Sequence, residues 1–450
     1  MKPLFFLLTF LSVGLISCGD SSSNSQSENH KKTHKADIAD IELGIRDYIS
    51  RTTEENSGFF PLEHDSGAMN LKLVRVHTEY LSNLGPKRYF ACVDLADEKG
   101  DVYDVDFFLE GVPGKMDVTE TTVHKLNGKP FYTWEQQPDK TWERESVEGS
   151  GKELLGVVEG SDAFDFNYAV TLPEITGPSE IWIPVATSNA FQDVELTSVE
   201  SPRALTFSEE EKYGNTVGYL KLNRDDSGAK IALNYRVNRR EKRPYEEPGT
   251  DPSEYLDGSD LIPVGGRFSS IVEEALDGKQ GDSKLMQARA IYDYIIDNMR
   301  YRKAGEYGTG DANYACDAKS GNCTEFHSFF ISLARTAGIP ARFAIGAAIP
   351  SERNEGGVNG YHCWAEFYAE NKWWPVDISE GNKYTPLATY YFGHHPANRL
   401  ELSRGRDLLV KPSPASGTIP FFAYPVIEIE GRQTTARTEF SFERKSGSAA

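Results

Sequence analysis

Residues 321–342 read GNCTEFHSFFISLARTAGIPAR and predict a helix that begins beside a cysteine. Asn322 is a favourable N-cap residue, and Glu325 follows three positions later, as in a capping box. The apolar residues after the cysteine recur at helical spacing: Phe326, Phe329, Phe330, Leu333 and Ala337. The GIP sequence at 338–340 then ends the helix. Cys323 is therefore expected in the first turn, where free backbone N–H groups and the helix dipole favour a thiolate.

A second stretch, YHCWAEFYAENKWWPVDIS at 361–379, predicts a β-hairpin with its turn in AENK. With the turn centred on residues 370–371, His362 and Asp377 fall diagonally on one face of the hairpin. A carboxylate in that place orients the imidazole and stabilises its charged form, and such an imidazole can take a proton from a cysteine. Cys323, His362 and Asp377 are therefore the candidate nucleophile, base and orienting acid.

Each of these residues also has an ordinary structural interpretation. Free cysteines are among the most buried residue types, a strand histidine beside a tryptophan is often only packed, and an aspartate after a strand often caps the next element. His327 and the pair at 394–395 are alternative bases, but neither has an evident carboxylate at a fixed geometry. The order of the three candidates, with the cysteine at a helix start and the other two on one hairpin face, favours the catalytic interpretation.

These segments resemble the three motifs of the transglutaminase-like superfamily, papain-related proteins with a Cys-His-Asp centre. The cysteine motif with its R-x-x-GIPAR ending is the specific one, while YHCWAEFY and WWPVDIS support it by order and spacing. The resemblance covers residues 283–380. It implies Cys323 as nucleophile, His362 as general base and acid, and Asp377 as orienting residue in acyl transfer from an amide through a thioester.

The resemblance leaves the acyl acceptor open, because the superfamily includes cross-linking enzymes, peptidases, deamidases and members without known activity. We expect a cysteine peptidase or amidase that acts on a peptide or protein, since SERNEGGVNG at 351–360 reads as a mobile loop that could admit water. A protein-glutamine gamma-glutamyltransferase and a non-catalytic binding protein with a vestigial triad are the alternatives. Trp364, beside the triad, is a candidate substrate-binding residue, although core packing also explains such a tryptophan.

The N-terminus predicts a lipoprotein signal at 1–17. One lysine and an apolar run, too short to span a membrane, precede a cysteine. LISC at 15–18 resembles the lipobox of bacterial lipoproteins, which implies cleavage before Cys18 and acylation of that residue. An ordinary signal peptide with an incidental cysteine is the alternative, but the polar tether at 18–37 favours a lipid anchor. We therefore expect a lipid-anchored protein of the bacterial cell envelope, facing the periplasm or the exterior.

Charge and cysteine content exclude several classes of protein. The net charge of −20 argues against nucleic acid as a partner, because phosphate binding needs clustered lysine and arginine. Besides Cys18 there are four cysteines, at 92, 316, 323 and 363, too few for a disulfide framework in 450 residues.

A disulfide between Cys316 and Cys363 stays open at this point. A zinc site of these two residues with Cys323 and His362 is disfavoured, because His362 and Cys363 are adjacent strand residues whose side chains point to opposite faces. We therefore expect neither a metal nor another cofactor at the catalytic site.

The whole chain reads as a multidomain α+β protein. Residues 38–158 predict a small α+β domain with a linker, residues 159–245 a β-sandwich with short alternating strands, and residues 246–262 a connector. The papain-like transglutaminase core, with helices and an antiparallel sheet, is expected at 263–410. Residues 411–450 are expected to add C-terminal strands to that core, followed by a tail.

Overall fold

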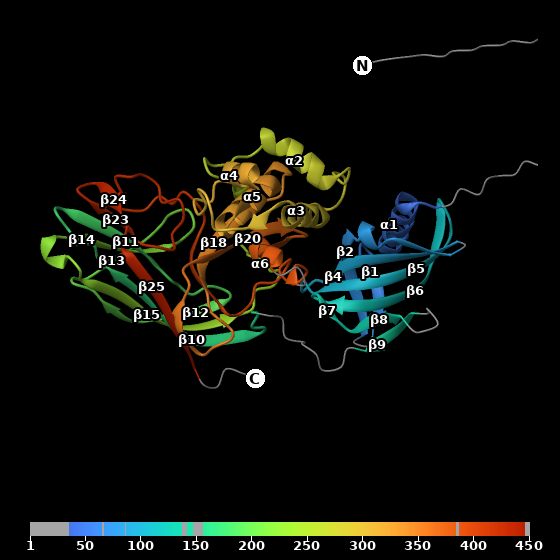
Figure 1. Cartoon of the computed structure of the whole chain (residues 1–450), viewed down its shortest axis with the longest axis horizontal. Coiled ribbons are helices and arrows are strands. Elements are labelled where there is room, and N and C mark those ends of the chain that lie inside the picture. Colours follow the sequence, from blue (N-terminus) through green and yellow to red (C-terminus); the bar gives the residue numbers. More distant parts are fainter. Residues whose placement is uncertain are drawn as a thin grey trace, which may run out of the picture. The chain divides into compact units, whose positions relative to one another are not determined.

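The computed structural model, drawn in Figure 1, describes residues 36–64, 67–85, 87–136, 142–146, 156–383 and 387–445. The predicted signal sequence and Cys18 lie outside these residues, so lipid attachment stays a prediction. Among the helices in the described ranges, none is long and apolar enough to cross a bilayer.

The first part of the chain is a helix packed on an antiparallel sheet. The helix α1 (Ile38–Glu55) begins after the N-cap Asp37. Its buried isoleucines at 41, 45 and 49 form one face and share a core with the sheet. The strand order is β1-β2-β4-β5-β6-β7, with β3 on β4. The strands are β1 (Phe60–His64), β2 (Gly67–Val76), β3 (Ser82–Gly85), β4 (Arg88–Ala96), β5 (Val102–Val112), β6 (Lys115–Leu126) and β7 (Lys129–Pro130), and the 3-10 helix η1 (Thr78–Tyr80) follows β2.

Short-range sequence signals account for two features of this region. Asn127 and Gly128 have φ angles of 51° and 81° and join β6 to β7 in a two-residue turn. The strands β8 (Tyr132–Gln136) and β9 (Trp142–Ser146) then pair with each other. Aromatic residues and threonine in YTWEQ favour a strand there.

Two five-stranded sheets, visible in Figure 1 as separate groups of strands, share one hydrophobic core. All their pairings are antiparallel, and burial alternates along β10 because one face of the strand packs inward. One sheet has the order β12-β15-β10-β25-β19, and the other has the order β13-β14-β11-β23-β24. The strands are β10 (Ser161–Thr171), β11 (Ser179–Val185), β12 (Gln192–Glu200), β13 (Thr206–Glu209), β14 (Thr216–Leu222), β15 (Lys230–Arg240), β19 (Glu355–Val358), β23 (Val426–Ile429), β24 (Arg432–Thr434) and β25 (Arg437–Arg444). Short 3-10 helices lie at η2 (Arg224–Asp226) and η3 (Pro252–Tyr255).

The strand pairing corrects two expectations from the sequence. The C-terminal strands β23 and β25 pair with β11 and β10 and do not extend the catalytic sheet. The stretch at 351–360 is not loop throughout, because its residues 355–358 form β19 on the edge of β25. Both errors concern partners far away in the sequence, for which local patterns carry no signal.

The region of the resemblance combines helices with a four-stranded antiparallel sheet of order β21-β20-β18-β22. The helix α5 packs on this sheet, and the phenylalanines at 326, 329 and 330 share a core with Ala365 and Phe367. Figure 1 shows α3, α4 and α5 grouped beside β18 and β20. The elements are α2 (Arg267–Leu276), α3 (Lys284–Asn298), β16 (Arg300–Tyr301), α4 (Ala312–Ala318), β17 (Ser320–Gly321), α5 (Cys323–Thr336), β18 (Ala341–Ala348), β20 (His362–Ala369), β21 (Lys372–Val376), α6 (Ile378–Lys383) and β22 (Arg399–Arg404).

A buried group of charges connects Lys242, two residues after the end of β15, to this sheet. The Lys242 Nζ lies 2.6 Å from Glu366 Oε1 on β20 and 3.3 Å from Glu401 Oε2 on β22. Arg342 on β18 approaches the same Glu366, with Nε 2.7 Å from Oε2. All four side chains are buried, and such charges are tolerated only when they are paired.

Candidate active site

The candidate nucleophile lies at the start of α5, as the capping pattern predicts. The Thr324 N–H donates to Asn322 Oδ1 (2.8 Å), and the Asn322 N–H donates to Glu325 Oε2 (3.0 Å), which completes the capping box. The other carboxylate oxygen of Glu325 accepts from the N–H groups of two loop glycines. Cys323 is the first helical residue and is 2% exposed. Its backbone N–H belongs to the first turn, which has no intrahelical acceptors.

The hairpin register brings the other two candidates into contact. Ala369 pairs with Lys372 across a two-residue turn whose residues have φ angles of 52° and 62°. This register places His362 Nε2 2.6 Å from Asp377 Oδ2. The other oxygen of Asp377 accepts from Ser379 Oγ (2.9 Å) and from the backbone N–H of residue 380 (3.1 Å). The carboxylate is therefore held at both oxygens.

Asp377 keeps the imidazole of His362 protonated. Burial lowers the pKa of His362, but the charge of Asp377 and its hydrogen bond outweigh burial and raise the pKa to about 9. Burial in turn acts to raise the pKa of Asp377, and the charge of His362 with its hydrogen bond holds it well below its usual range. The pair is therefore an imidazolium and a carboxylate at neutral pH.

The thiol of Cys323 is ionised by its neighbours. Burial favours the neutral thiol, but hydrogen bonds with Cys363 and His362 and the charge of His362 hold the pKa of Cys323 well below its usual range. Because Nε2 of His362 binds Asp377, Nδ1 is the nitrogen left for the thiol. Cys323 and His362 thus form a thiolate and imidazolium pair.

With this geometry in place, comparison with known proteins becomes informative. Residues 270–378 match the family model of the transglutaminase-like superfamily, and this range contains Cys323, His362 and Asp377. Residues 270–378 form a transglutaminase-like domain. The resemblance seen in the sequence is thereby confirmed, and with it a core of helices and antiparallel sheet.

Several relatives are similar to the chain at low identity. An uncharacterized protein of Haemophilus influenzae is 26% identical over 318 residues, which is 60% of this chain and 85% of the relative. The crystal structure of a "putative cysteine protease" from Cytophaga hutchinsonii is 16% identical with a TM-score of 0.41, and it covers 64% of this chain and 99% of its own. The periplasmic domain of TgpA from Pseudomonas aeruginosa is 16% identical with a TM-score of 0.30, and it covers 58% of this chain and 85% of its own.

Cys363 is a neighbour of Cys323 in the transglutaminase-like domain, and we did not predict this from the sequence. Burial and the adjacent Cys323 raise the pKa of Cys363 well above its usual value, so its S–H remains available to donate to the Cys323 thiolate. Strand alternation separates Cys363 from His362, yet both act to lower the pKa of Cys323. The four described cysteines are free, and Cys316 is not bonded to Cys363.

The alternative bases have other roles. His327 Nδ1 donates to the carbonyl oxygen of Cys323 (2.7 Å), while its Nε2 accepts from the backbone N–H of Ile378 (3.2 Å). Both nitrogens are therefore occupied, and His327 links the first turn of α5 to the chain beside Asp377. His394 lies fully buried, 3.3 Å from Asp101.

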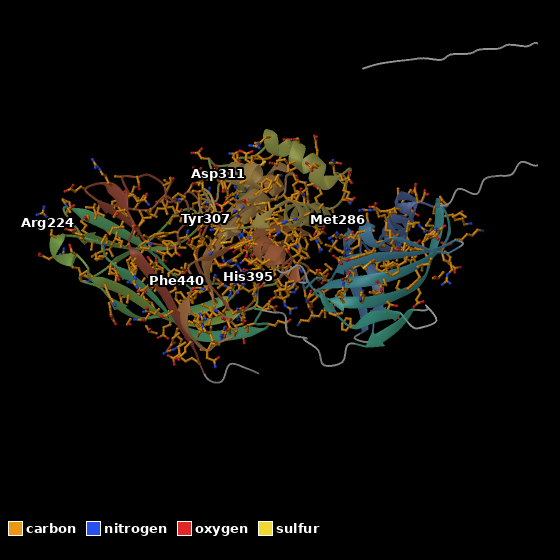
Figure 2. The ribbon with its side chains drawn as sticks, viewed as in Figure 1. Arg224, Met286, Tyr307, Asp311, His395 and Phe440 are labelled. Carbon is orange, nitrogen blue, oxygen red and sulfur yellow. The ribbon has the colours of Figure 1, made fainter. Side chains whose placement is uncertain are left out.

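Trp364, the candidate substrate-binding residue, is buried like the triad, and its contact with a substrate stays a prediction. Its ring lies 4.2 Å from that of His395, labelled in Figure 2, and 6.4 Å from that of His362. Burial holds the pKa of His395 well below its usual value, so a neutral ring packs there. Trp364 supports the histidine side of the site from within the core.

Tyrosines surround the thiolate. Burial and the charge of Cys323 raise the pKa values of Tyr301, Tyr361 and Tyr424 above their ordinary value. The Asn322 Nδ2 donates to the Tyr361 hydroxyl (3.1 Å), and the Tyr361 ring lies 5.4 Å from that of Tyr424. These tyrosines form an aromatic cover beside Cys323, which is itself buried.

Proposed function

We propose that the chain is a thiol hydrolase of the bacterial cell envelope, tethered by a lipid at Cys18, that cleaves an amide bond of a peptide or protein. The observation that carries this proposal is the fixed contact of His362 with Asp377 beside a thiol of lowered pKa. Perturbed pKa values at one buried constellation are typical of catalytic sites. The family match adds that this constellation stands in a transglutaminase-like domain.

The chemistry follows from the protonation states. The Cys323 thiolate attacks the amide carbon, and the oxyanion forms near the Cys323 backbone N–H at the helix start. The imidazolium of His362 gives its proton to the leaving amine, which departs and leaves a thioester. His362 then takes a proton from water as the water attacks the thioester. The acid leaves and the thiolate and imidazolium are restored, while Asp377 holds the ring throughout.

Water is favoured over an amine as acceptor because water needs no positioned binding site. A lysine side chain carries a positive charge in solution, and a carboxylate at the site would help to hold it. Glu380 lies 3.9 Å from His362 Nε2, but its Oε1 is 2.7 Å from Lys383 Nζ. That pairing neutralises the carboxylate and leaves it poorly suited to bind a cationic acceptor. The loop at 351–360 no longer supports hydrolysis, because part of it is the strand β19.

A product analysis separates the possible reactions. Mature protein is incubated with a mixed peptide library and a primary-amine tracer, and products are identified by mass spectrometry. The Cys323→Ala variant removes the nucleophile, and Cys316→Ser is the matched control that removes another buried thiol. We expect new peptide termini or Gln-to-Glu conversions in the wild type and in Cys316→Ser, and none in Cys323→Ala.

Other outcomes would overturn the proposal. Cys323-dependent incorporation of the tracer into glutamine as the main product would make the protein a gamma-glutamyltransferase. Identical product lists for the wild type and Cys323→Ala would indicate a binding protein with a vestigial triad.

A further inference from the structure

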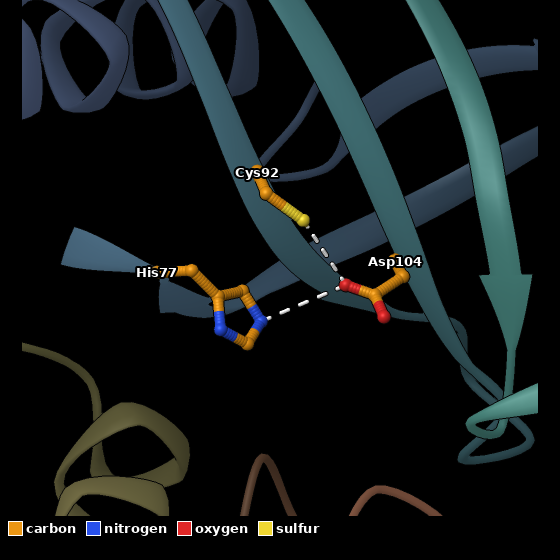
Figure 3. A group of neighbouring side chains, drawn as sticks. All are labelled: His77, Cys92 and Asp104. Carbon is orange, nitrogen blue, oxygen red and sulfur yellow. Dashed lines mark hydrogen bonds and ion pairs between the residues drawn. The ribbon is translucent and has the colours of Figure 1, made fainter. Parts of the chain in front are cut away.

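A second buried cluster of reactive side chains lies in the N-terminal sheet, apart from the catalytic residues (Figure 3). His77 follows β2, Cys92 and Asp94 lie on β4, and Asp104 lies on β5. The cysteine and Asp94 are two positions apart and share a face of β4, and Asp94 is directly opposite Asp104. Each of the four is at most 8% exposed. The catalytic mechanism uses none of them.

The inner atoms of His77, Cys92 and Asp104 lie within 4.8 Å of one another, and Asp94 approaches His77. The His77 Nε2 is 2.9 Å from Asp94 Oδ1 and 3.6 Å from Asp104 Oδ1. The Cys92 Sγ lies 3.3 Å from the same Asp104 Oδ1, as the dashed lines in Figure 3 show. Ligands of a tetrahedral zinc ion, with bonds of about 2.0–2.3 Å, are separated from one another by about 3.3–3.5 Å. The two separations that involve Asp104 Oδ1, 3.3 Å to Cys92 Sγ and 3.6 Å to His77 Nε2, are close to this value.

The outer atoms of the same side chains are held by other residues. Glu79 Oε1 lies 3.0 Å from His77 Nδ1, which fixes the ring with Nε2 directed at Asp94 and Asp104. Asp94 Oδ2 is 3.0 Å from Arg289 Nη1, and Asp104 Oδ2 is 3.0 Å from Lys125 Nζ. Contacts of this kind orient the ligands of a metal ion. A carboxylate binds the far nitrogen of the histidine, and other residues bind the far oxygens of the carboxylates.

The pairing of Asp94 with Asp104 is an independent indication of a cation. Like charges directly opposite each other on neighbouring strands destabilise a sheet, and the cost grows when both are buried. Each outer oxygen has its own cation, and both inner oxygens approach Nε2 of His77, at 2.9 and 3.6 Å. A divalent cation bound at Nε2 supplies positive charge between the two carboxylates.

We propose that His77, Cys92 and Asp104 bind one Zn²⁺, with Asp94 as the carboxylate beside His77. Nitrogen, thiolate and carboxylate ligands suit zinc, and the burial of all three residues favours a structural site over a catalytic one. On binding, the Cys92 thiol gives up its proton to solvent and binds as thiolate. The ion joins the segment after β2 to β4 and β5, and the Asp94 contact with Arg289 on α3 extends this cross-link to the transglutaminase-like domain.

Metal content and a cobalt spectrum test the site. Mature protein is loaded with Zn²⁺ or Co²⁺, dialysed and analysed for metal. We expect one Zn²⁺ per chain, and a thiolate-to-cobalt charge-transfer band, in the wild type. Both should persist in the matched thiol variants Cys316→Ser and Cys323→Ser and be lost in Cys92→Ser. Asp377→Asn should also keep them, which separates this site from the group formed by His362, Asp377 and Glu380.

A milder variant keeps the test decisive if Cys92→Ser does not fold. Glu79→Gln leaves all three ligands in place and weakens only the support of His77, so zinc affinity should fall about 10–100-fold in a competition titration. The proposal is overturned if the folded wild type retains no zinc after loading, since the cluster is then a metal-free ion-paired network. It is also overturned if folded Cys92→Ser keeps the cobalt band, or if Glu79→Gln binds zinc as tightly as the wild type.

Discussion

Asp377→Asn tests whether the carboxylate is what keeps the thiol of Cys323 ionised. The substitution keeps the size of the side chain and removes its charge. The pKa of His362, about 9 in the wild type, then loses the contribution that raises it, and burial acts alone. It should fall to the ordinary value of about 6.5 or lower, so that the imidazole is neutral at pH 7 and above.

The pKa of the Cys323 thiol depends on the charge of this imidazole. Without the imidazolium, and with burial opposing ionisation, the pKa of Cys323 should rise at least to the ordinary value of about 8.5, which leaves about 3% thiolate at pH 7. A more basic thiolate is a better nucleophile, and this offsets part of the loss. Alkylation of Cys323 at pH 7 should therefore slow about 10- to 30-fold.

The assay is iodoacetamide labelling of folded protein, with the Cys323 peptide quantified by mass spectrometry between pH 6 and pH 9. The wild-type rate should be nearly flat from pH 6 to pH 8, because the ion pair persists until His362 loses its proton near pH 9. The variant rate should climb with pH. Glu380→Gln is the matched control, since it neutralises a carboxylate 3.9 Å from the same imidazole without removing its hydrogen bond. Equal rates at pH 7 in the wild type and folded Asp377→Asn would refute the reasoning.

Three further predictions concern other parts of the molecule. Cys363→Ala removes an S–H donor to the Cys323 thiolate, so the pH at which Cys323 alkylation reaches half its maximum should rise; an unchanged profile would deny Cys363 this role. Cys18→Ser should abolish incorporation of labelled fatty acid in a bacterial host, and equal labelling of wild type and variant would contradict lipid attachment. Lys242→Met removes the cation 2.6 Å from buried Glu366 and should cost about 3–5 kcal/mol, seen as a lower thermal midpoint, whereas an unchanged midpoint would show that the remaining partners suffice.

Local sequence patterns predicted the helix and the hairpin that carry the candidate triad. The N-cap Asn322 and the two-residue turn at 370–371 are short-range signals, and each has the backbone conformation that its residues favour. From them followed the position of Cys323 and the contact of His362 with Asp377. These elements were predictable because the residues that decide them are within a few positions of each other.

The rest of the structure depends on partners distant in the sequence. The pairing of β10 with β25 joins residues 164 and 444, and no local pattern in either strand identifies its partner. The tyrosine cover of the thiolate likewise comes from separate segments. The His77 cluster was missed for the same reason, because its ligands are single residues on different strands and gather only when the sheet register is known.

The position of β25 has a consequence for how the molecule is made. Its neighbour β10 is synthesised almost three hundred residues earlier, so β10 emerges long before the strand that flanks it on one side. Until then that edge presents unpaired backbone groups, which are prone to associate with other chains. Closing such distant contacts is also slow, because loop-closure entropy must be overcome first. A nonsense codon or protease cut before residue 426 would therefore do more than shorten the tail: it would leave β10 and β11 each with one bare edge, a species that invites aggregation and quality-control proteolysis.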